Sequence, residues 1–261
     1  MPKVCLDAGH YGNYNRSPGV PAYYEGAQMW KLTQHLAAEL QKRGISVIQT
    51  RTSQDADLAL ATRGKKAKGC DLFVSLHSNA VGSGMNESVD YPLAVVMLDG
   101  CTDDIGKKLA DSVAAVMGTK QKGKTTTKAG STGGEYYGVL RGAAAVGVPG
   151  LILEHSFHTH TKMANWLLSD ANLTKLAAAE AECIASHLQV KAPAKQEAFI
   201  PYLVKITADS LNVRAGAGTS YKVNTTVKKG GVYTIVDAKN GWGKLKSGAG
   251  WINLSYTQKL R

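Results

Sequence analysis

Three polar side chains follow three short apolar runs in this chain, and their types suit a metal site. The runs are residues 4–9, 71–76 and 150–153, and the side chains that follow them are His10, His77 and Glu154. Each run is short and stops at polar or turn-forming residues, which predicts a buried strand. Because the carboxyl ends of parallel strands line one crevice, we expect these three side chains to converge there.

Glu25 adds a carboxylate just before a helix predicted over residues 27–43. Together His10, Glu25 and His77 would supply three ligands and leave a fourth position open, which describes a catalytic zinc site. Glu154 would stand beside the open position, take a proton from the attacking water and return it to the leaving group. Spacing alone leaves an alternative open for each residue: packing for a strand-end histidine, and pairing with the helix dipole for Glu25.

A second group of histidines lacks a carboxylate at ligand spacing and is expected to be solvated or hydrogen-bonded: His155, His158 and His160. Side chains alternate along a strand, so His155 should point away from the side that carries Glu154. Arg141, beside a strand predicted over 136–140, is a candidate for pairing with a substrate carboxylate or with a nearby acidic side chain. The sequence contains no G-x-S-x-G motif, which argues against a serine hydrolase.

Strands and helices are expected to alternate over the first 190 residues. Amphipathic or apolar periodicity predicts helices at 27–43, 58–68, 103–117 and 173–188, and further strands at 45–50, 93–98 and 136–140. This alternation predicts an α/β fold with a mainly parallel, doubly wound sheet flanked by helices. Residues 118–134 are rich in Lys, Thr and Gly without periodicity, which predicts a long functional or mobile loop.

The tail of the chain has a different character. Six short β-rich runs, separated by turn residues, predict a small all-β barrel over 199–261. The stretch 191–198 is polar and contains Pro193, which is typical of a linker. The expected organisation is a catalytic domain over 1–190, a linker over 191–198 and a second domain over 199–261.

The formal net charge of +11 is concentrated in the tail, where residues 195–261 carry 11 Lys and Arg against 3 Asp and Glu. Without a nucleic-acid motif, this excess indicates attraction to anionic polymers, and no nucleic-acid partner is expected. No apolar run reaches the ~18 residues that span a bilayer, so no membrane insertion is expected. Met1-Pro2-Lys3 leads into the first strand without a signal-peptide pattern, so we expect synthesis in the cytoplasm without an export signal.

An ordered set of motifs resembles the zinc-dependent N-acetylmuramoyl-L-alanine amidases, the type 3 amidases of autolysins and phage endolysins. It consists of D-A-G-H (7–10), Glu25 before a helix, T-R-T-x-x-D (50–55), the later Leu60 and Arg63, D-L-F-V-S-L-H-S-N-A (71–80), V-L-R (139–141) and L-I-L-E (151–154). The resemblance covers residues 3 to about 188. It departs at His155, where the family often has glycine, and this affects the expected shape of the loop after Glu154.

The resemblance implies one Zn²⁺ per chain and hydrolysis of the amide between the lactyl group of N-acetylmuramic acid and the L-alanine of the stem peptide. The implied zinc ligands are His10, Glu25 and His77, and the implied acid/base is Glu154. Asn79 and Arg141 are expected to contact the substrate.

The tail resembles bacterial SH3-type wall-binding domains. The motifs are L-N-V-R-A-G-A-G-T-S-Y (211–221), G-W-G-K-L (241–245) and G-W-I-N (250–253). They imply peptidoglycan or an attached anionic wall polymer as the partner. The whole chain then resembles a phage or prophage endolysin that acts on the wall after release. The alternatives are a mother-cell or other autolysin, a zinc peptidase acting on the stem peptide, and a wall-binding protein without catalysis.

Overall fold

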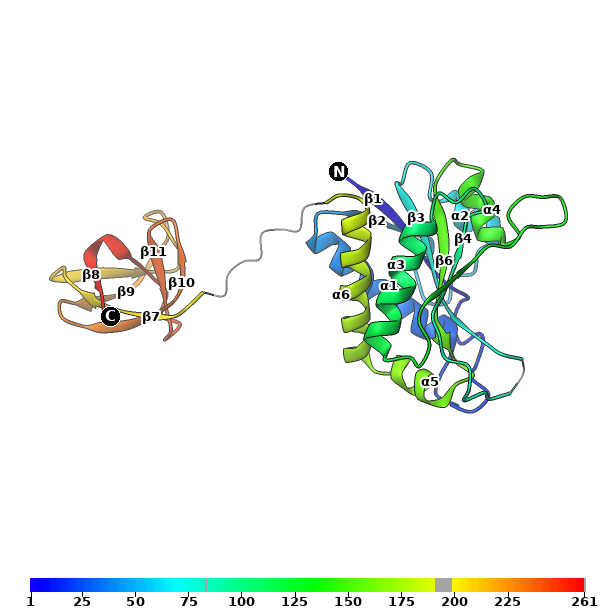
Figure 1. Ribbon diagram of the computed structural model, residues 1–261. Helices are drawn as coiled ribbons and strands as arrows, with labels where there is room; N and C mark the ends of the chain where they lie inside the picture. Colours follow the sequence, from blue (N-terminus) through cyan, green and yellow to red (C-terminus); the bar gives the residue numbers. More distant parts are fainter. Residues whose placement is uncertain (83, 191–198, 261) are drawn as a thin grey trace. The chain divides into compact units, whose positions relative to one another are not determined.

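The computed structural model describes residues 1–82, 84–190 and 199–260 (Figure 1). The chain forms two compact units, Met1–Ala194 and Lys195–Arg261. The linker expected over 191–198 lies outside the described residues. In the described part of the chain, no helix has the length and apolar character needed to cross a membrane.

A six-stranded sheet forms the centre of the first unit, in the order β2-β1-β3-β6-β4-β5. Its strands are β1 (Lys3–Ala8), β2 (Ser46–Gln49), β3 (Leu72–Asn79), β4 (Leu93–Val96), β5 (Lys124–Thr126) and β6 (Gly150–Phe157). Neighbouring strands run parallel, except that β4 is antiparallel to β6. The predicted mainly parallel α/β sheet is therefore confirmed.

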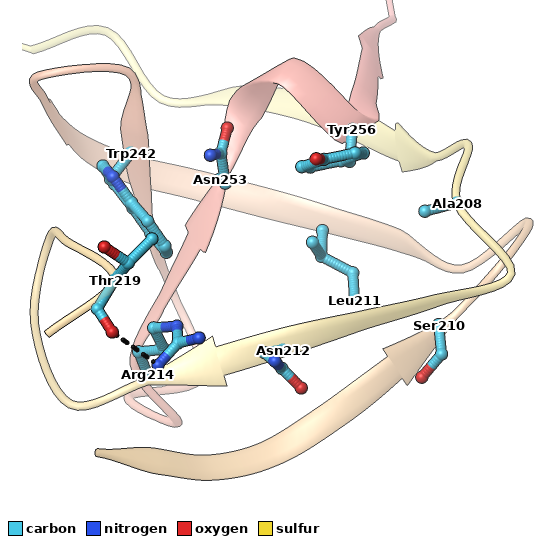
Figure 2. Close-up of a pocket in the computed structure, with 9 residues that line it drawn as sticks. All are labelled: Ala208, Ser210, Leu211, Asn212, Arg214, Thr219, Trp242, Asn253 and Tyr256. Carbon is cyan, nitrogen blue, oxygen red and sulfur yellow. Dashed lines mark hydrogen bonds between the residues drawn. The ribbon is translucent and has the colours of Figure 1, made fainter. Parts of the chain in front are cut away.

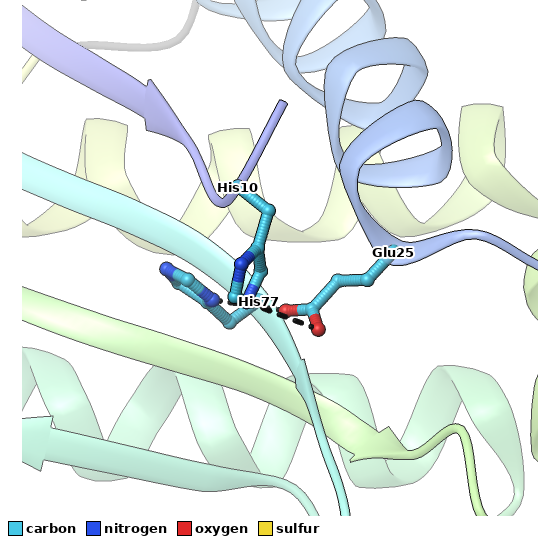
Figure 3. Close-up of side chains that lie close together, drawn as sticks. All are labelled: His10, Glu25 and His77. Carbon is cyan, nitrogen blue, oxygen red and sulfur yellow. Dashed lines mark hydrogen bonds and ion pairs between the residues drawn. The ribbon is translucent and has the colours of Figure 1, made fainter. Parts of the chain in front are cut away.

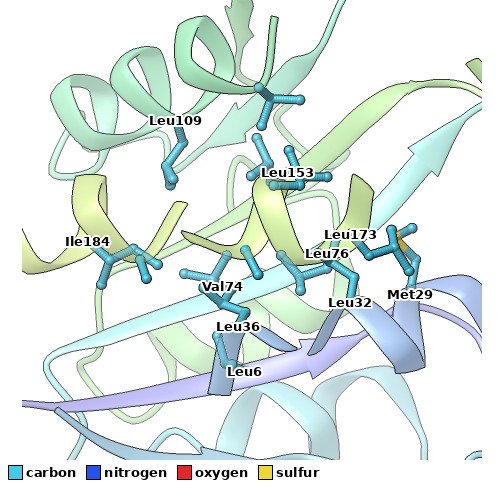
Figure 4. Packing of buried hydrophobic residues seen from close by; sticks show 14 of the residues in the cluster. Leu6, Met29, Leu32, Leu36, Val74, Leu76, Leu109, Leu153, Leu173 and Ile184 are labelled. Carbon is cyan, nitrogen blue, oxygen red and sulfur yellow. The ribbon is translucent and has the colours of Figure 1, made fainter. Parts of the chain in front are cut away.

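Helices cover both faces of this sheet. They are α1 (Glu25–Lys42), α2 (Leu60–Lys65), α3 (Asp103–Met117), α4 (Gly138–Ala144), α5 (Thr161–Leu167) and α6 (Asp170–His187). The apolar positions of α1 recur at three and four residues, and Met29, Leu32 and Leu36 are fully buried with side chains of α3 and α6 (Figure 4). On the opposite face, Val139 and Leu140 of α4 join a second core with strand residues such as Phe73.

Two expectations about this unit were wrong. The segment predicted as a strand over 136–140 enters helix α4, because a short apolar pair such as Val139-Leu140 has no period that separates a strand from a buried helix. Arg141 therefore lies on a helix. The predicted loop 118–134 contains the short edge strand β5, whose residues are exposed and carry no apolar signal. Helix α5 was not foreseen.

Replacing Gly64 by alanine is expected to destabilise the first unit by about 1–3 kcal/mol, because the site is already fully packed. A Cβ at this position would overlap the carbonyl oxygen of Val139 and lie 2.6 Å from the amide nitrogen of Ala143, both in the backbone of α4. Urea unfolding of the full chain measures the loss. Gly134→Ala is the matched control, because a Cβ there meets nothing within 4 Å, and it should change stability little.

The second unit is a seven-stranded antiparallel sheet in the order β13-β7-β10-β11-β12-β8-β9. Its strands are β7 (Tyr202–Ile206), β8 (Ser210–Arg214), β9 (Val223–Lys228), β10 (Val232–Lys239), β11 (Trp242–Leu245), β12 (Trp251–Asn253) and β13 (Thr257–Lys259). Alternating residues such as Val204 and Ile206 fill its core. The short 3-10 helix η1 (Leu254–Tyr256) and strand β13 were not foreseen.

Candidate active site

Three potential metal ligands converge at one end of the central strands (Figure 3). One donor atom from each of His10, Glu25 and His77 lies within 4.8 Å of the others. Nε2 of His10 is 3.4 Å from Glu25 Oε2, and Nδ1 of His77 is 2.9 Å from Glu25 Oε1. The convergence expected from the sequence is therefore observed.

The backbone around His10 is shaped to present its ring. His10 follows β1 by two residues and has a φ of 55°, a left-handed conformation that costs a non-glycine residue roughly 1 kcal/mol. The guanidinium of Arg63 compensates by donating to the carbonyl oxygens of Ala8 and His10, both at 2.7 Å. Gly9 lets the His77 ring lie close to the backbone, because a Cβ on residue 9 would overlap that ring.

The buried carboxylate of Asp7 holds together the side chains that support the backbone around His10. Asp7 is fully buried, accepts hydrogen bonds from the hydroxyls of Thr50 and Ser75, and lies 3.2 Å from Nε of Arg63. Arg51, also buried, donates to the carbonyl oxygen of Ala8 at 3.1 Å. The sequence motifs contained these residues without revealing that they support the histidine loop. The available signal in the sequence was that charged residues stand within or beside apolar runs, where a buried charge needs a partner.

His77 and Glu154 lie within their strands, which corrects the expectation that both follow strand ends. β3 continues to Asn79 and β6 to Phe157. In the parallel pairing of these strands His77 stands directly opposite Glu154. Side chains opposite each other on neighbouring strands point to the same face, so this register places Glu154 beside the donor set. Glu25 is the first residue of α1, one step inside the helix it was expected to precede.

The charges in the site favour an ionised Glu25. Burial alone would raise its pKa, but the hydrogen bond and charge of His77, the charge of His10 and the Ser78 N–H outweigh burial and hold the pKa below its ordinary value. Burial would lower the pKa of His77, and Glu25 reverses this and raises it. For His10, burial dominates and the pKa is lowered. A carboxylate anion with two imidazoles around it can bind a divalent cation, which then displaces the protons from the imidazole nitrogens that act as ligands.

Glu154 has the properties of a proton-transfer group. Its Oε2 is buried and has no hydrogen-bond partner among the described residues. Burial raises its pKa to about 7, with His77 opposing and Glu25 adding to the shift. A carboxyl group with a pKa near neutrality can both accept and release a proton at physiological pH.

The two expected substrate-binding residues differ in their surroundings. Asn79 ends β3, two residues after His77, and its Oδ1 accepts the N–H of Ala80 at 2.8 Å. Arg141 donates to the backbone carbonyl oxygens of Glu135 and Tyr136 and so stabilises the turn before α4. A substrate contact for either residue stays a prediction.

The second histidine group is buried, and His155 and His158 are hydrogen-bonded, which is one of the two roles expected for the group. Both ring nitrogens of His160 are buried without a hydrogen-bond partner among the described residues. His155 is fully buried, its Nε2 lies 2.7 Å from Oε1 of Glu180 on α6, and its Nδ1 lies 2.8 Å from the carbonyl oxygen of His77. His158 is 2% exposed, and its Nδ1 lies 3.0 Å from the carbonyl oxygen of Ser78. Both histidines therefore contact the backbone that carries the donor set. Only their tertiary contacts reveal this.

The residues present fit a zinc ion. Two imidazoles and one carboxylate, without a thiolate, form the donor set typical of a catalytic site with an open position. The buried Oε2 of Glu154, which has no hydrogen-bond partner among the described residues, is free to accept a proton beside such a site. An α/β sheet carrying this set at one end of its central strands is typical of a metal-dependent hydrolase.

Comparison with known proteins gives the family. Residues 4–186 match the N-acetylmuramoyl-L-alanine amidase family, and residues 209–258 match the bacterial SH3 domain family. The chain belongs to the N-acetylmuramoyl-L-alanine amidases. The resemblance seen in the sequence is therefore confirmed for both parts of the chain.

Curated relatives and solved structures agree with this assignment. The chain is 29% identical over 227 residues to N-acetylmuramoyl-L-alanine amidase CwlM of Bacillus licheniformis, covering 83% of this chain and 82% of that protein. It is 27% identical over 229 residues to the sporulation-specific N-acetylmuramoyl-L-alanine amidase of Bacillus subtilis, with the same coverage of 83% and 82%. The catalytic domain of CwlV from Bacillus (Paenibacillus) polymyxa superimposes with a TM-score of 0.62 at 20% identity, covering 73% of this chain and 100% of that one.

Proposed function

We propose that this chain hydrolyses the amide between the lactyl group of N-acetylmuramic acid and the L-alanine of the stem peptide, using one zinc ion held by His10, Glu25 and His77. The observation that carries the proposal is this donor set beside Glu154, on the fold of the amidase family. A zinc ion bound there supplies Lewis-acid polarisation of the scissile carbonyl and an acidified water as nucleophile.

The protein's own groups perform the remaining steps. Glu154 accepts a proton from the attacking water and delivers it to the departing amine of L-alanine, which otherwise leaves poorly. The Ser78 N–H, 3.0 Å from Oε1 of Glu25, and the amide of Asn15, which donates to Oε2, orient the Glu25 carboxylate. These contacts hold the donor set without help from the substrate.

Product analysis of digested wall tests the reaction. We expect new L-alanine amino groups and intact glycan chains. A zinc peptidase would instead cut within the stem peptide and leave the lactyl amide intact. Release of peptide fragments that lack the N-terminal L-alanine would contradict the proposed bond.

Removing the metal is expected to abolish hydrolysis reversibly. Treatment with a chelator should bring activity to background, and one equivalent of Zn²⁺ should restore it. The reason is that the proposed reaction needs the cation held by the three donors. His77→Ala should bind zinc much more weakly, whereas His35→Ala, a half-buried histidine of α1, is the matched control. Full activity in the metal-free enzyme would refute zinc dependence.

The C-terminal unit is proposed to hold the enzyme on the wall. Its match to the bacterial SH3 domain family and its basic charge support binding to peptidoglycan, with anionic wall polymers as a second attraction. No nucleic-acid partner is proposed. Sedimentation with purified wall, with and without the attached anionic polymers, measures the two contributions.

We further propose that the enzyme is made in the cytoplasm and acts on the wall after release, as a phage or prophage endolysin does. A mother-cell autolysin is the second candidate, and the similarity to a sporulation-specific amidase of Bacillus subtilis favours it. Lysis of an expressing culture only after membrane permeabilisation is the result expected for the endolysin. Lysis without permeabilisation would contradict it.

A further inference from the structure

The C-terminal unit contains a hollow of about 390 Å³ lined by residues of β8, β11, β12 and η1 (Figure 2). This volume lies within the ~300–1,000 Å³ typical of small-ligand sites. Trp242 and Tyr256 stand on two sides of the hollow, with Leu211 and Asn253 between them. The hollow is therefore lined by aromatic rings on two sides, with an apolar side chain and an amide side chain between them.

Three side chains of the hollow offer hydrogen-bond donors that have no acceptor among the described residues, whereas the hydroxyls of Ser210, Thr219 and Tyr256 and the amide of Asn212 can donate or accept. Arg214 uses Nη1 to donate to the carbonyl oxygens of Thr219 and Tyr221, at 2.9 and 2.8 Å, and within the described residues its Nε and Nη2 have no acceptor. Asn253 accepts the backbone N–H two residues on through Oδ1, and its Nδ2 makes no hydrogen bond in the described part of the chain. The same holds for the indole N–H of Trp242. A ligand rich in carbonyl and carboxylate oxygens would satisfy all three groups.

The charge of the hollow limits the ligand further. Among the nine described residues that line it, Arg214 alone is charged. Other cations of this unit, such as Lys228, Lys244 and Lys246, are exposed and do not line the hollow. A polyanion would need a row of cations, whereas one guanidinium, fixed by two carbonyl contacts, presents a planar fork to a single carboxylate.

We propose that this hollow binds a short peptide with a free carboxylate. The carboxylate lies on Arg214, and the carbonyl oxygens of the peptide accept hydrogen bonds from Asn253 and Trp242. Such chemistry belongs to the stem peptide of peptidoglycan, so the inference rests on the proposed function and extends it to the tail. The C-terminal unit then binds the stem peptide, the part of the wall polymer that the first unit releases.

Calorimetric titration of the full-length protein tests this site. The probes are the tripeptide Ala-Glu-Lys with free carboxyl groups and the same peptide with every carboxyl converted to an amide. We expect the free acid to bind and amidation to weaken binding at least tenfold, because a charged hydrogen bond contributes roughly 1.5–3 kcal/mol. Arg214→Gln should weaken binding of the free acid by a similar factor.

Two further variants separate a specific site from general attraction. Tyr256→Ala removes the aromatic ring at one side of the hollow. Because Tyr256 is 51% exposed, folding should persist while peptide binding weakens. Lys244→Gln removes the same charge as Arg214→Gln from an exposed position outside the hollow and should leave binding unchanged. Equal binding of the amidated peptide, equal losses for Lys244→Gln and Arg214→Gln, or no loss for Tyr256→Ala would overturn the proposal. Equal losses would indicate attraction to any anionic wall polymer.

This test is independent of catalysis. The tripeptide lacks the lactyl amide and cannot be cleaved by the proposed reaction. Lys244→Gln, which changes a side chain outside the hollow, should hydrolyse a soluble muramoyl peptide at the wild-type rate. Peptide binding without hydrolysis in the wild type would contradict only the proposed function, and hydrolysis without peptide binding would contradict only the proposed hollow.

Discussion

Replacing Glu154 by glutamine is expected to lower kcat for amide hydrolysis by about 10²–10⁴-fold while the metal content stays that of the wild type. Glutamine keeps the size of the side chain and cannot take up a proton from water. Glu154 stands opposite His77 and outside the three-donor set, so its replacement removes no ligand. Steady-state kinetics on a soluble muramoyl peptide, with metal analysis of the same samples, measures both effects.

The matched control is Glu182→Gln, which changes an exposed carboxylate on α6 in the same way. It should leave kcat, KM and metal content unchanged. Wild-type turnover in Glu154→Gln would remove Glu154 from proton transfer. Loss of metal from Glu154→Gln would instead assign this residue to the ligand set.

Replacing Glu180 by leucine is expected to lower the free energy of unfolding of the first unit by about 3–5 kcal/mol, the range measured when one partner of a buried ion pair is removed. The side chains of His155 and Glu180 are 0% and 1% exposed. Both ring nitrogens of His155 face acceptors, the Glu180 carboxylate and the His77 carbonyl oxygen. Burial would lower the pKa of His155, but these two contacts raise it and so favour the doubly protonated, positively charged ring. Without Glu180 that charge is buried with no counter-charge.

Urea unfolding followed by near-ultraviolet circular dichroism measures this loss. Glu182→Leu is the control on the same helix and should change stability by at most about 0.5 kcal/mol, because its side chain is 64% exposed. The double variant His155→Leu with Glu180→Leu should recover most of the loss, since an apolar pair replaces both charges. A single-variant loss below about 1 kcal/mol would mean that the pair contributes little to stability.

Much of the fold could be predicted because its signals lie in consecutive residues. The helix over 103–117 was predicted with the bounds that the structure shows, since its apolar positions recur at the helical period and Gly118 follows as a left-handed cap. The first of the six β-rich runs expected in the tail, residues 202–206, also coincides with β7. Elements without a strong period failed: the apolar pair in α4 was taken for a strand, and the exposed strand β5 was missed.

The donor set could also be named from the sequence, because residue types at the ends of apolar runs together with the ordered motifs identify His10, Glu25 and His77. Their meeting point depends on the strand order, which places β1 and β3 side by side although His77 follows His10 by 67 positions in the sequence. The orientation of Glu154 depends on the register of β3 against β6. Neither order nor register is written in any local pattern.

The sequence by itself determined the class of fold, the two-part organisation and the chemical types of the site residues. The tertiary structure alone decided which contacts support them. Arg63 donates to the carbonyl oxygen of His10, and Glu180 is hydrogen-bonded to His155, which in turn contacts the carbonyl oxygen of His77. The physical reason is that hydrophobic periodicity and turn preference act between near neighbours in the chain. Buried charges instead select partners according to which surfaces the packed helices and strands bring together.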